Sequence, residues 1–171
     1  GSLALAAGQL RDALSRAGPF EAEIATLKRL AGDNADVVAA IASIENMAAK
    51  GVPSRAALVS RLPAIVDKIV AAARAPKDGD WVERTVSKLR GFVIVRRVDG
   101  KGEDTDSVVA RAEAAAYRGD LSVATSEIAK LNKNAGDEVK VWLENARARL
   151  AVEEARAALN RFVLNELAAS D

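Results

Sequence analysis

Residues 137–169 read DEVKVWLENARARLAVEEARAALNRFVLNELAA and contain neither glycine nor proline. This is typical of one uninterrupted helix, because glycine and proline are the residues that most often end helices. At the α-helical rise of about 1.5 Å per residue, such a helix extends on the order of 45 Å. A helix of that length is expected to project beyond a small bundle or to pack against another chain.

Upstream of residue 137, apolar side chains recur at helical spacing, and turn residues divide the pattern into shorter helices. The expected helices cover about residues 3–17, 20–31, 34–50, 55–74, 107–118 and 121–131. Pro19 is expected to open the second helix, because its fixed φ suits a first helical position. Asp33 and Ser54 are expected to cap the third and fourth helices. Pro63 is expected to kink or split the fourth, and the whole pattern predicts an all-α fold of antiparallel helical hairpins.

Residues 110–131 resemble a tetratricopeptide hairpin. Small side chains let two helices touch, and Gly119-Asp120 supplies the turn between them. Trp142 and Leu143 would then begin the first helix of a following repeat. A generic alanine-rich antiparallel pair explains the same pattern, so both interpretations stay open.

The window between Ala75 and Ala110 lacks alanine, although the rest of the chain is rich in it. Alanine offers little side chain for recognition, so this window is the expected place for a specific contact. Residues 80–97 combine an apolar face with five basic and two acidic residues. Aromatic side chains at the headgroup boundary and basic side chains on anionic lipid would make this segment an interfacial lipid-binding helix. The predicted lipid-binding residues are Trp81, Arg84, Lys88, Arg90, Phe92, Arg96 and Arg97.

An ordinary amphipathic helix that packs on the bundle, with its charges in water, explains the same segment. The long helix raises a similar question, because it has more apolar surface than a lone projecting helix should expose. We expect it to form a homo-oligomer, and the predicted self-association residues are Trp142, Leu150, Leu159, Phe162 and Leu167. The alternative is that the helix folds back over the N-terminal hairpins and buries these residues within one chain.

The composition excludes several functional classes. The chain has no cysteine and no histidine, which excludes zinc sites and nucleophilic systems that depend on those residues. Its net charge is +1, from 25 basic and 24 acidic residues, so the concentrated basic footprint of a nucleic-acid-binding protein is missing. Carboxylate pairs such as Glu153-Glu154 have no apolar setting that would prepare them for acid–base chemistry. We therefore expect no enzyme, no cofactor, no metal and no nucleic-acid partner.

The patterns divide the chain into four parts. Residues 1–2 look like a cloning remnant, and residues 3–75 form N-terminal helical hairpins. Residues 76–108 hold the basic amphipathic segment and a polar loop, and residues 109–171 hold the hairpin and the long helix. Since the chain does not begin with methionine, we interpret it as an excised part of a longer protein.

Several short motifs follow one another along the chain. They are Leu3-Ala4-Leu5-Ala6-Ala7-Gly8-Gln9-Leu10-Arg11, Gly18-Pro19-Phe20, Gly51-Val52-Pro53-Ser54, Val93-Ile94-Val95-Arg96-Arg97 and Arg111-Ala112-Glu113 … Gly119-Asp120-Leu121. Their order resembles the C-terminal part of alphaproteobacterial mitofilin-like membrane proteins. The Val-Arg-Arg element and the Gly-Asp-Leu hairpin are the more specific motifs.

The resemblance implies a transmembrane helix and a coiled-coil stalk ahead of a soluble domain on the periplasmic side of the bacterial inner membrane. Mitochondrial relatives shape cristae junctions and tether the inner membrane to outer-membrane translocases. Bacterial relatives are linked to membrane curvature and to outer-membrane assembly machinery. The implied partners are therefore an anionic membrane surface and envelope proteins. Family lipid-binding helices lie close to the mitofilin domain, which suits residues 80–97.

Two other functions stay open. One is a tetratricopeptide-like adaptor that binds a peptide in its concave face and ignores lipid. The other is an accessory protein of tetrapyrrole biosynthesis, because membrane proteins of that class look similar around Val95-Arg96-Arg97. A transmembrane helix with heptads upstream would favour the membrane organiser or the tetrapyrrole protein over the adaptor.

Overall fold

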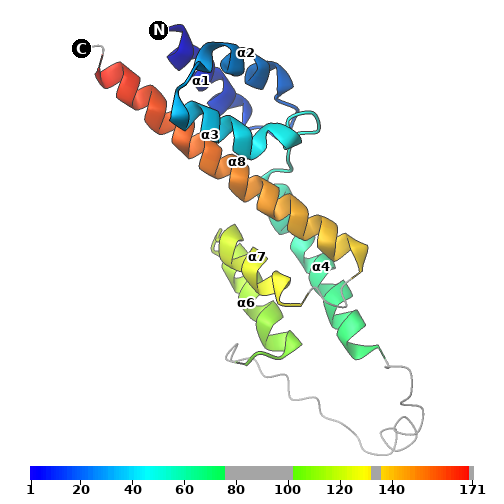
Figure 1. Cartoon of the computed structure of the whole chain (residues 1–171). Coiled ribbons are helices and arrows are strands. Elements are labelled where there is room, and N and C mark those ends of the chain that lie inside the picture. Colours follow the sequence, from blue (N-terminus) through cyan, green and yellow to red (C-terminus); the bar gives the residue numbers. More distant parts are fainter. Residues whose placement is uncertain (76–101, 132–135, 170–171) are drawn as a thin grey trace, which may run out of the picture. The chain divides into compact units, whose positions relative to one another are not determined.

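A computed structural model describes residues 1–75, 102–131 and 136–169, and the structural statements below concern those residues. They are all-α, as the sequence predicts, and contain no strand (Figure 1). The elements are α1 (Ser2–Ala13), α2 (Glu21–Ala31), α3 (Ala35–Ile44), a 3₁₀ turn η1 (Glu45–Met47), α4 (Arg55–Arg74), α6 (Thr105–Tyr117), α7 (Leu121–Ala129) and α8 (Asp137–Ala168). The predicted long helix is confirmed, and it ends one residue before the predicted limit.

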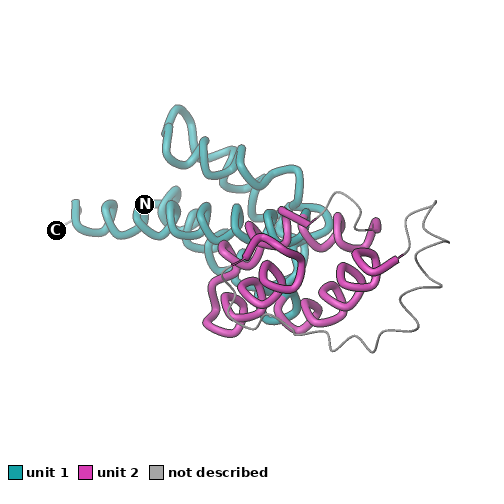
Figure 2. The backbone as a smooth tube through the Cα atoms, turned by 90° about the horizontal axis from the view of Figure 1, so that it is seen from below, with its two compact units in different colours: residues 1–58, 144–171 teal, residues 59–143 magenta. Residues whose placement is uncertain are grey.

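The chain divides into two compact units, of which the first joins the two ends of the sequence and the second is one continuous stretch (Figure 2). Unit 1 comprises residues 1–58 and 144–171, and unit 2 comprises residues 59–143. Unit 1 therefore contains α1, α2, α3 and most of α8, and unit 2 contains most of α4 together with α6 and α7.

The core of unit 1 is made mostly of aliphatic side chains from α1, α2, α3 and α8, together with Phe20 and Phe162. Leu10, Leu27 and Ile44 are fully buried there, and Leu159 of α8 joins the same cluster. Burying one such side chain stabilises the fold by about 1.5–3 kcal/mol. The spaces between these larger groups are filled by buried alanines, namely Ala6, Ala7, Ala13, Ala31, Ala40 and Ala155. The small side chains let the helices of unit 1 pack closely in a chain whose aromatic content is only 4%.

Two of the predicted helix starts are wrong by a residue or two. The side chain of Asn34 caps α3 by accepting a hydrogen bond from the Val37 N–H at 3.1 Å, whereas Asp33 was expected to do so. Pro19 lies outside α2, because Phe20 is the N-cap and the helix begins at Glu21. Neighbouring cap-forming residues such as Asp33 and Asn34 give the same sequence signal, and the path of the preceding turn decides between them.

The fourth helix has the predicted start but not the predicted break. Ser54 Oγ accepts a hydrogen bond from the Ala57 N–H at 3.1 Å, which confirms the cap. Pro63 lies inside α4, yet the helix continues from Arg55 to Arg74, so Pro63 does not split it, and the alternative of a kink stays a prediction. Leu62 and Ile65 are buried on either side of the proline. Packing of that apolar face holds the helix together despite the missing backbone hydrogen bond.

In unit 2, α6 and α7 form the predicted antiparallel hairpin (Figure 1). Gly119 makes the turn with a φ of +80°, a conformation that costs glycine little. Asp104 and Asp120 cap the two helices, because each carboxylate accepts a hydrogen bond of 3.0 Å from a backbone N–H three residues later. Whether the hairpin is a true tetratricopeptide unit stays a prediction.

Candidate functional site

All seven predicted lipid-binding residues lie outside the described residues. They are Trp81, Arg84, Lys88, Arg90, Phe92, Arg96 and Arg97. Their role stays a prediction, and so does the alternative that this segment packs on the bundle. The described residues on both sides of the segment nevertheless show where its two flanks lie in unit 2.

The two flanks of residues 76–101 lie close together in unit 2. Arg74 ends α4, and its Nη2 lies 3.9 Å from Oδ1 of Asp106 in the first turn of α6. Both side chains are partly exposed, so this ion pair adds little stability. Its value here is geometric, because it shows that Arg74 and Asp106, which flank residues 76–101 in sequence, lie side by side.

Arg111 holds the downstream flank in place. Its Nη1 donates to the Gly102 carbonyl at 2.6 Å, and its Nε and Nη2 donate to Oε2 of Glu127 at 3.1 Å and 2.9 Å. One guanidinium thus ties the loop at residue 102 to both α6 and α7. Ser107 Oγ adds a hydrogen bond of 2.9 Å to Asp104 Oδ2 within the same loop.

Glu127 is the acidic partner in this arrangement, and its side chain is only 13% exposed. Burial alone would raise the pKa of Glu127. The hydrogen bonds from Arg111 and Lys130, together with their positive charges, outweigh burial and leave the pKa below its ordinary value. The carboxylate therefore stays ionised near neutral pH and keeps its hold on Arg111.

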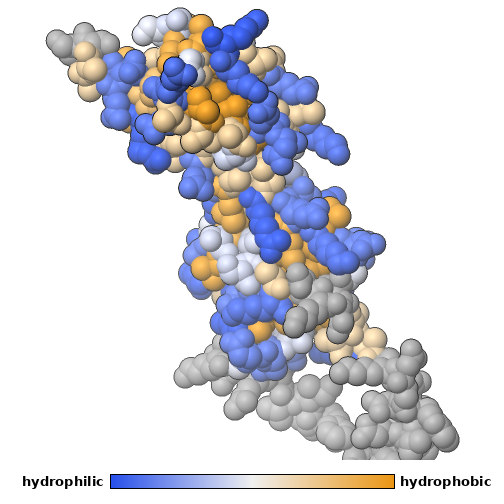
Figure 3. All heavy atoms as spheres, in the orientation of Figure 1, coloured by the Kyte–Doolittle hydropathy of each residue, from blue (hydrophilic) through white to orange (hydrophobic). Residues whose placement is uncertain are grey.

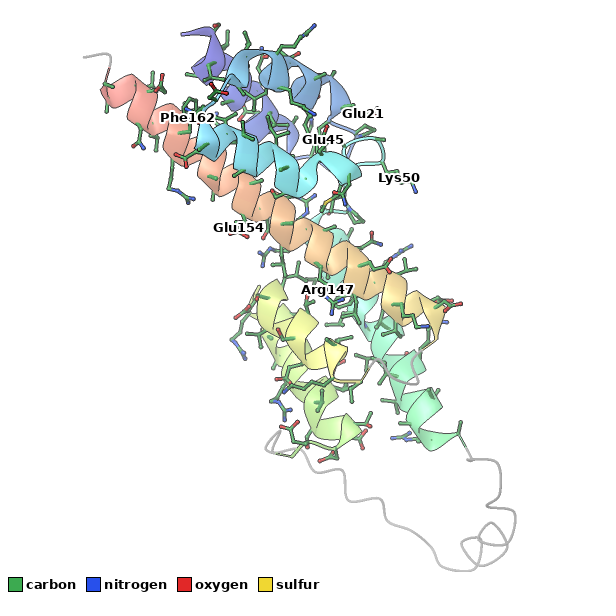
Figure 4. All side chains as sticks on the ribbon, viewed as in Figure 1. Glu21, Glu45, Lys50, Arg147, Glu154 and Phe162 are labelled. Carbon is green, nitrogen blue, oxygen red and sulfur yellow. The ribbon has the colours of Figure 1, made fainter. Side chains whose placement is uncertain are left out.

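The structure separates the five predicted self-association residues. Trp142, Leu159 and Phe162 are buried, Leu150 is half-buried, and Leu167 is 59% exposed. Leu159 and Phe162 pack in the core of unit 1, and Phe162 is labelled where α8 runs beside α3 in Figure 4. For these two residues α8 does cover the N-terminal helices, as the alternative interpretation expected. Leu167 remains available to a second copy of the chain.

Sequence reasoning missed two exposed leucines in unit 1 that are of the same kind as Leu167. Leu5 is 67% exposed and Leu164 is 55% exposed. Leu5 and Leu167 line a hollow of about 400 Å³ between the start of α1 and the end of α8. Apolar patches bordered by charged side chains are visible on the face shown in Figure 3. Leu5 lies outside the apolar stripe of α1 that contains the buried Ala6 and Leu10. Its position off that stripe was the sequence signal that could have identified it as exposed.

Arg149 of α8 is a second residue that sequence reasoning missed. It is 4% exposed, and its guanidinium donates to main-chain carbonyls only: Leu14 at 3.2 Å, Arg16 at 3.5 Å, Val52 at 2.8 Å and Pro53 at 2.8 Å. Burial lowers the pKa of Arg149, while the nearby Glu153 carboxylate opposes that shift. A guanidinium stays charged even so. Nothing in the sequence separates Arg149 from the exposed Arg147 and Arg156 on the same helix.

The described residues contain no cluster of three or more acidic side chains that could hold a metal ion. Within the same ranges, every helix is too short or too polar to cross a membrane.

A family model described as mitofilin, a mitochondrial inner membrane protein, matches residues 2–160. The chain belongs to the mitofilin family. The resemblance inferred from the short motifs is thereby confirmed at the level of the family, whereas the bacterial origin stays a prediction. No solved structure matches the chain.

Similar curated proteins come from fungi and bear the name MICOS complex subunit MIC60. The protein of Pyrenophora tritici-repentis is 34% identical over 139 residues, which cover 80% of this chain and 22% of that protein. The protein of Emericella nidulans is 32% identical over 158 residues, which cover 90% of this chain and 26% of that protein. The chain of this mitofilin-family member thus spans about a quarter or less of the length of these relatives.

Proposed function

We propose that this mitofilin-family chain is a membrane-contacting domain of a protein that organises the inner membrane, and that residues 80–97 make the contact. The observation that supports it most is the family match, which spans that segment and both of its described flanks. We place the domain on the periplasmic side of a bacterial inner membrane, anchored by a segment that is not part of this chain.

The chemistry of the segment suits this role. Each basic residue near an anionic surface contributes on the order of 1 kcal/mol, so the five basic residues together favour binding clearly. Trp81 and Phe92 would add buried apolar area at the headgroup boundary. The attraction should weaken as salt shortens the screening length. The Arg111 contact supports the proposal, because it fixes the chain just downstream of the segment.

Co-flotation with liposomes of graded anionic content tests the proposal. We expect wild type to float increasingly with anionic lipid, and Arg96→Glu combined with Arg97→Glu to abolish flotation. The matched control is Arg147→Glu with Arg156→Glu, which makes the same change of charge at exposed positions of α8. If both double variants float like wild type while Trp81→Ser unfolds at a lower temperature, then Trp81 belongs to the bundle and the proposal fails.

The proposal extends to partners. The similar fungal proteins are named as subunits of a complex, which supports tethering to other envelope proteins, with outer-membrane assembly machinery as the candidate class. We also propose that the chain forms a homo-oligomer through the exposed leucines at one end of unit 1, which include Leu167. Sedimentation of wild type and Leu167→Glu at high micromolar concentration tests this, because a monomer in both samples contradicts it.

The adaptor function keeps one supporting observation, the α6–α7 hairpin. It predicts binding of a peptide by unit 2 and no flotation with liposomes of any charge. No feature of the described residues favours the tetrapyrrole function.

A further inference from the structure

Arg149 connects two turns that are distant in sequence. The first turn, residues 14–18, leads from α1 to α2, and its Leu14 and Arg16 carbonyls accept hydrogen bonds from Arg149. The second turn, residues 51–55, leads into α4, and its Val52 and Pro53 carbonyls accept the other two. All of these residues belong to unit 1.

The two turns also contact each other directly. Gly51 has a φ of +69°, and a Cβ there would lie 2.4 Å from the carbonyl oxygens of Ala17 and Gly18. The main chains of the two turns therefore pack as closely as glycine allows. One helical turn further along α8, Glu153 forms an ion pair with Arg55, whose Nε donates to Oε1 at 3.1 Å. Residue 149 thus lies at the meeting point of three segments.

Arg149 places its positive charge against carbonyls that accept no hydrogen bond from within a helix. Leu14 and Arg16 follow the last residue of α1, where carbonyls are left without intrahelical donors and where the helix dipole favours a cation. A guanidinium has five N–H donors spread over a planar fork, enough for all four carbonyls, whereas an ammonium group has three donors on one nitrogen. Without Arg149, four buried or half-buried carbonyls in two turns would lose a donor together.

We propose that Arg149 is a positioning residue that couples these two turns into one cooperative element. Opening of the 14–18 turn then also releases the 51–55 turn, and with it the first turn of α4. Because α4 leads along the chain to residues 76–101, a disturbance at the end of α1 would reach the helix that precedes that segment. The coupling does not depend on lipid binding by residues 80–97.

Hydrogen exchange on the full chain tests the coupling, with backbone amides in residues 14–20 and 51–58 as the readout. In Arg149→Met we expect both sets to exchange at least about tenfold faster, because each loses charge-assisted hydrogen bonds. Amides in the middle of α2 and α3 should change little. Arg156→Met, an exposed arginine on the same helix, is the matched control and should leave both turns protected.

Arg149→Lys keeps the positive charge but loses the planar fork of the guanidinium. This variant also provides the test if Arg149→Met does not fold. In this lysine variant we expect protection to return only in part, because three donors on one nitrogen cannot replace the four contacts that the guanidinium makes through three nitrogens. The coupling is contradicted if Arg149→Met loosens one turn and leaves the other unchanged. It is contradicted too if every amide of unit 1 accelerates equally, or if Arg149→Lys protects both turns as well as wild type does.

Discussion

Each unit of the molecule contains one arginine that holds a turn, and the two arginines do so in different ways. In unit 1, Arg149 is almost fully buried and binds main-chain carbonyls only. In unit 2, Arg111 is partly exposed and shares its guanidinium between a carbonyl and the Glu127 carboxylate. A carbonyl cannot be protonated in the pH range where proteins are stable, whereas a carboxylate can. The comparison teaches where acid should act, because we expect the contact in unit 1 to be insensitive to pH and that in unit 2 to weaken in acid.

The largest effect is expected at the core of unit 1. Leu159→Ala leaves a cavity at a fully buried position and should lower the free energy of unfolding by about 2–5 kcal/mol. Leu167→Ala on the same helix removes an equal number of atoms from an exposed position, and we expect a change within about 0.5 kcal/mol. Urea unfolding measures both. Equal losses of unfolding free energy in the two variants would show that the end of α8 is covered by a contact from outside this chain.

Loss of Arg149 should have the next largest effect on stability. Hydrogen bonds to charged groups contribute about 1.5–3 kcal/mol, and buried acceptors left without a donor cost more than exposed ones, so Arg149→Met should destabilise unit 1 by about 3 kcal/mol. Arg111→Met should lower the unfolding midpoint by less, because Lys130 still donates to the Glu127 carboxylate when Arg111 is lost. The reverse order of the two midpoints would contradict the comparison.

Acid should weaken the unit 2 contact. The folded-state pKa of Glu127 lies below its ordinary value, so its contribution to stability is complete above the ordinary carboxyl pKa of about 4.3 and disappears as pH falls through the folded value. Protection of the amides in residues 102–107, taken as the exchange rate relative to the intrinsic rate at the same pH, should therefore fall below about pH 4 in wild type. Glu127→Gln should exchange faster than wild type at pH 7 and show a smaller further change in acid. An equal change with pH in the two proteins would show that other carboxylates dominate.

The smallest effect is expected at the hairpin caps. Asp120→Ala removes the hydrogen bond from the Val123 N–H and should cost about 1 kcal/mol, since Asp120 is exposed. Asp120→Asn keeps an acceptor and should cost less. Thermal unfolding of the two variants measures the difference, and a larger loss for Asn than for Ala would exclude capping as the role of this residue.

Features with a local cause could be predicted from the sequence. The long helix follows from a stretch without glycine or proline, the hairpin from Gly119-Asp120, and the start of α4 from Ser54. Family membership also followed from short motifs. These signals depend on neighbours along the chain, and tertiary packing did not override them.

Features that depend on distant contacts could not be predicted. Pro63 is held within α4 by buried neighbours, and Arg149 looks like any surface arginine until the 14–18 and 51–55 turns are placed beside it. The periodicity of α8 marks Leu159 and Leu167 alike as apolar, although one is buried and the other exposed. Only the packing of α8 against α1, α2 and α3 in unit 1 tells them apart.

Quenching of tryptophan emission by brominated lipid tests most directly whether residues 80–97 enter a membrane. The chain has two tryptophans, and Trp142 is 3% exposed, so it serves as an internal reference that lipid should not reach. With anionic vesicles we expect wild-type emission to shift to the blue and to be quenched by about half, and high salt should reverse both changes, as screening requires. Trp81→Phe should show neither change. If wild type and Trp81→Phe respond alike to the vesicles, or if neither responds, then Trp81 does not enter the membrane and the proposed function is contradicted.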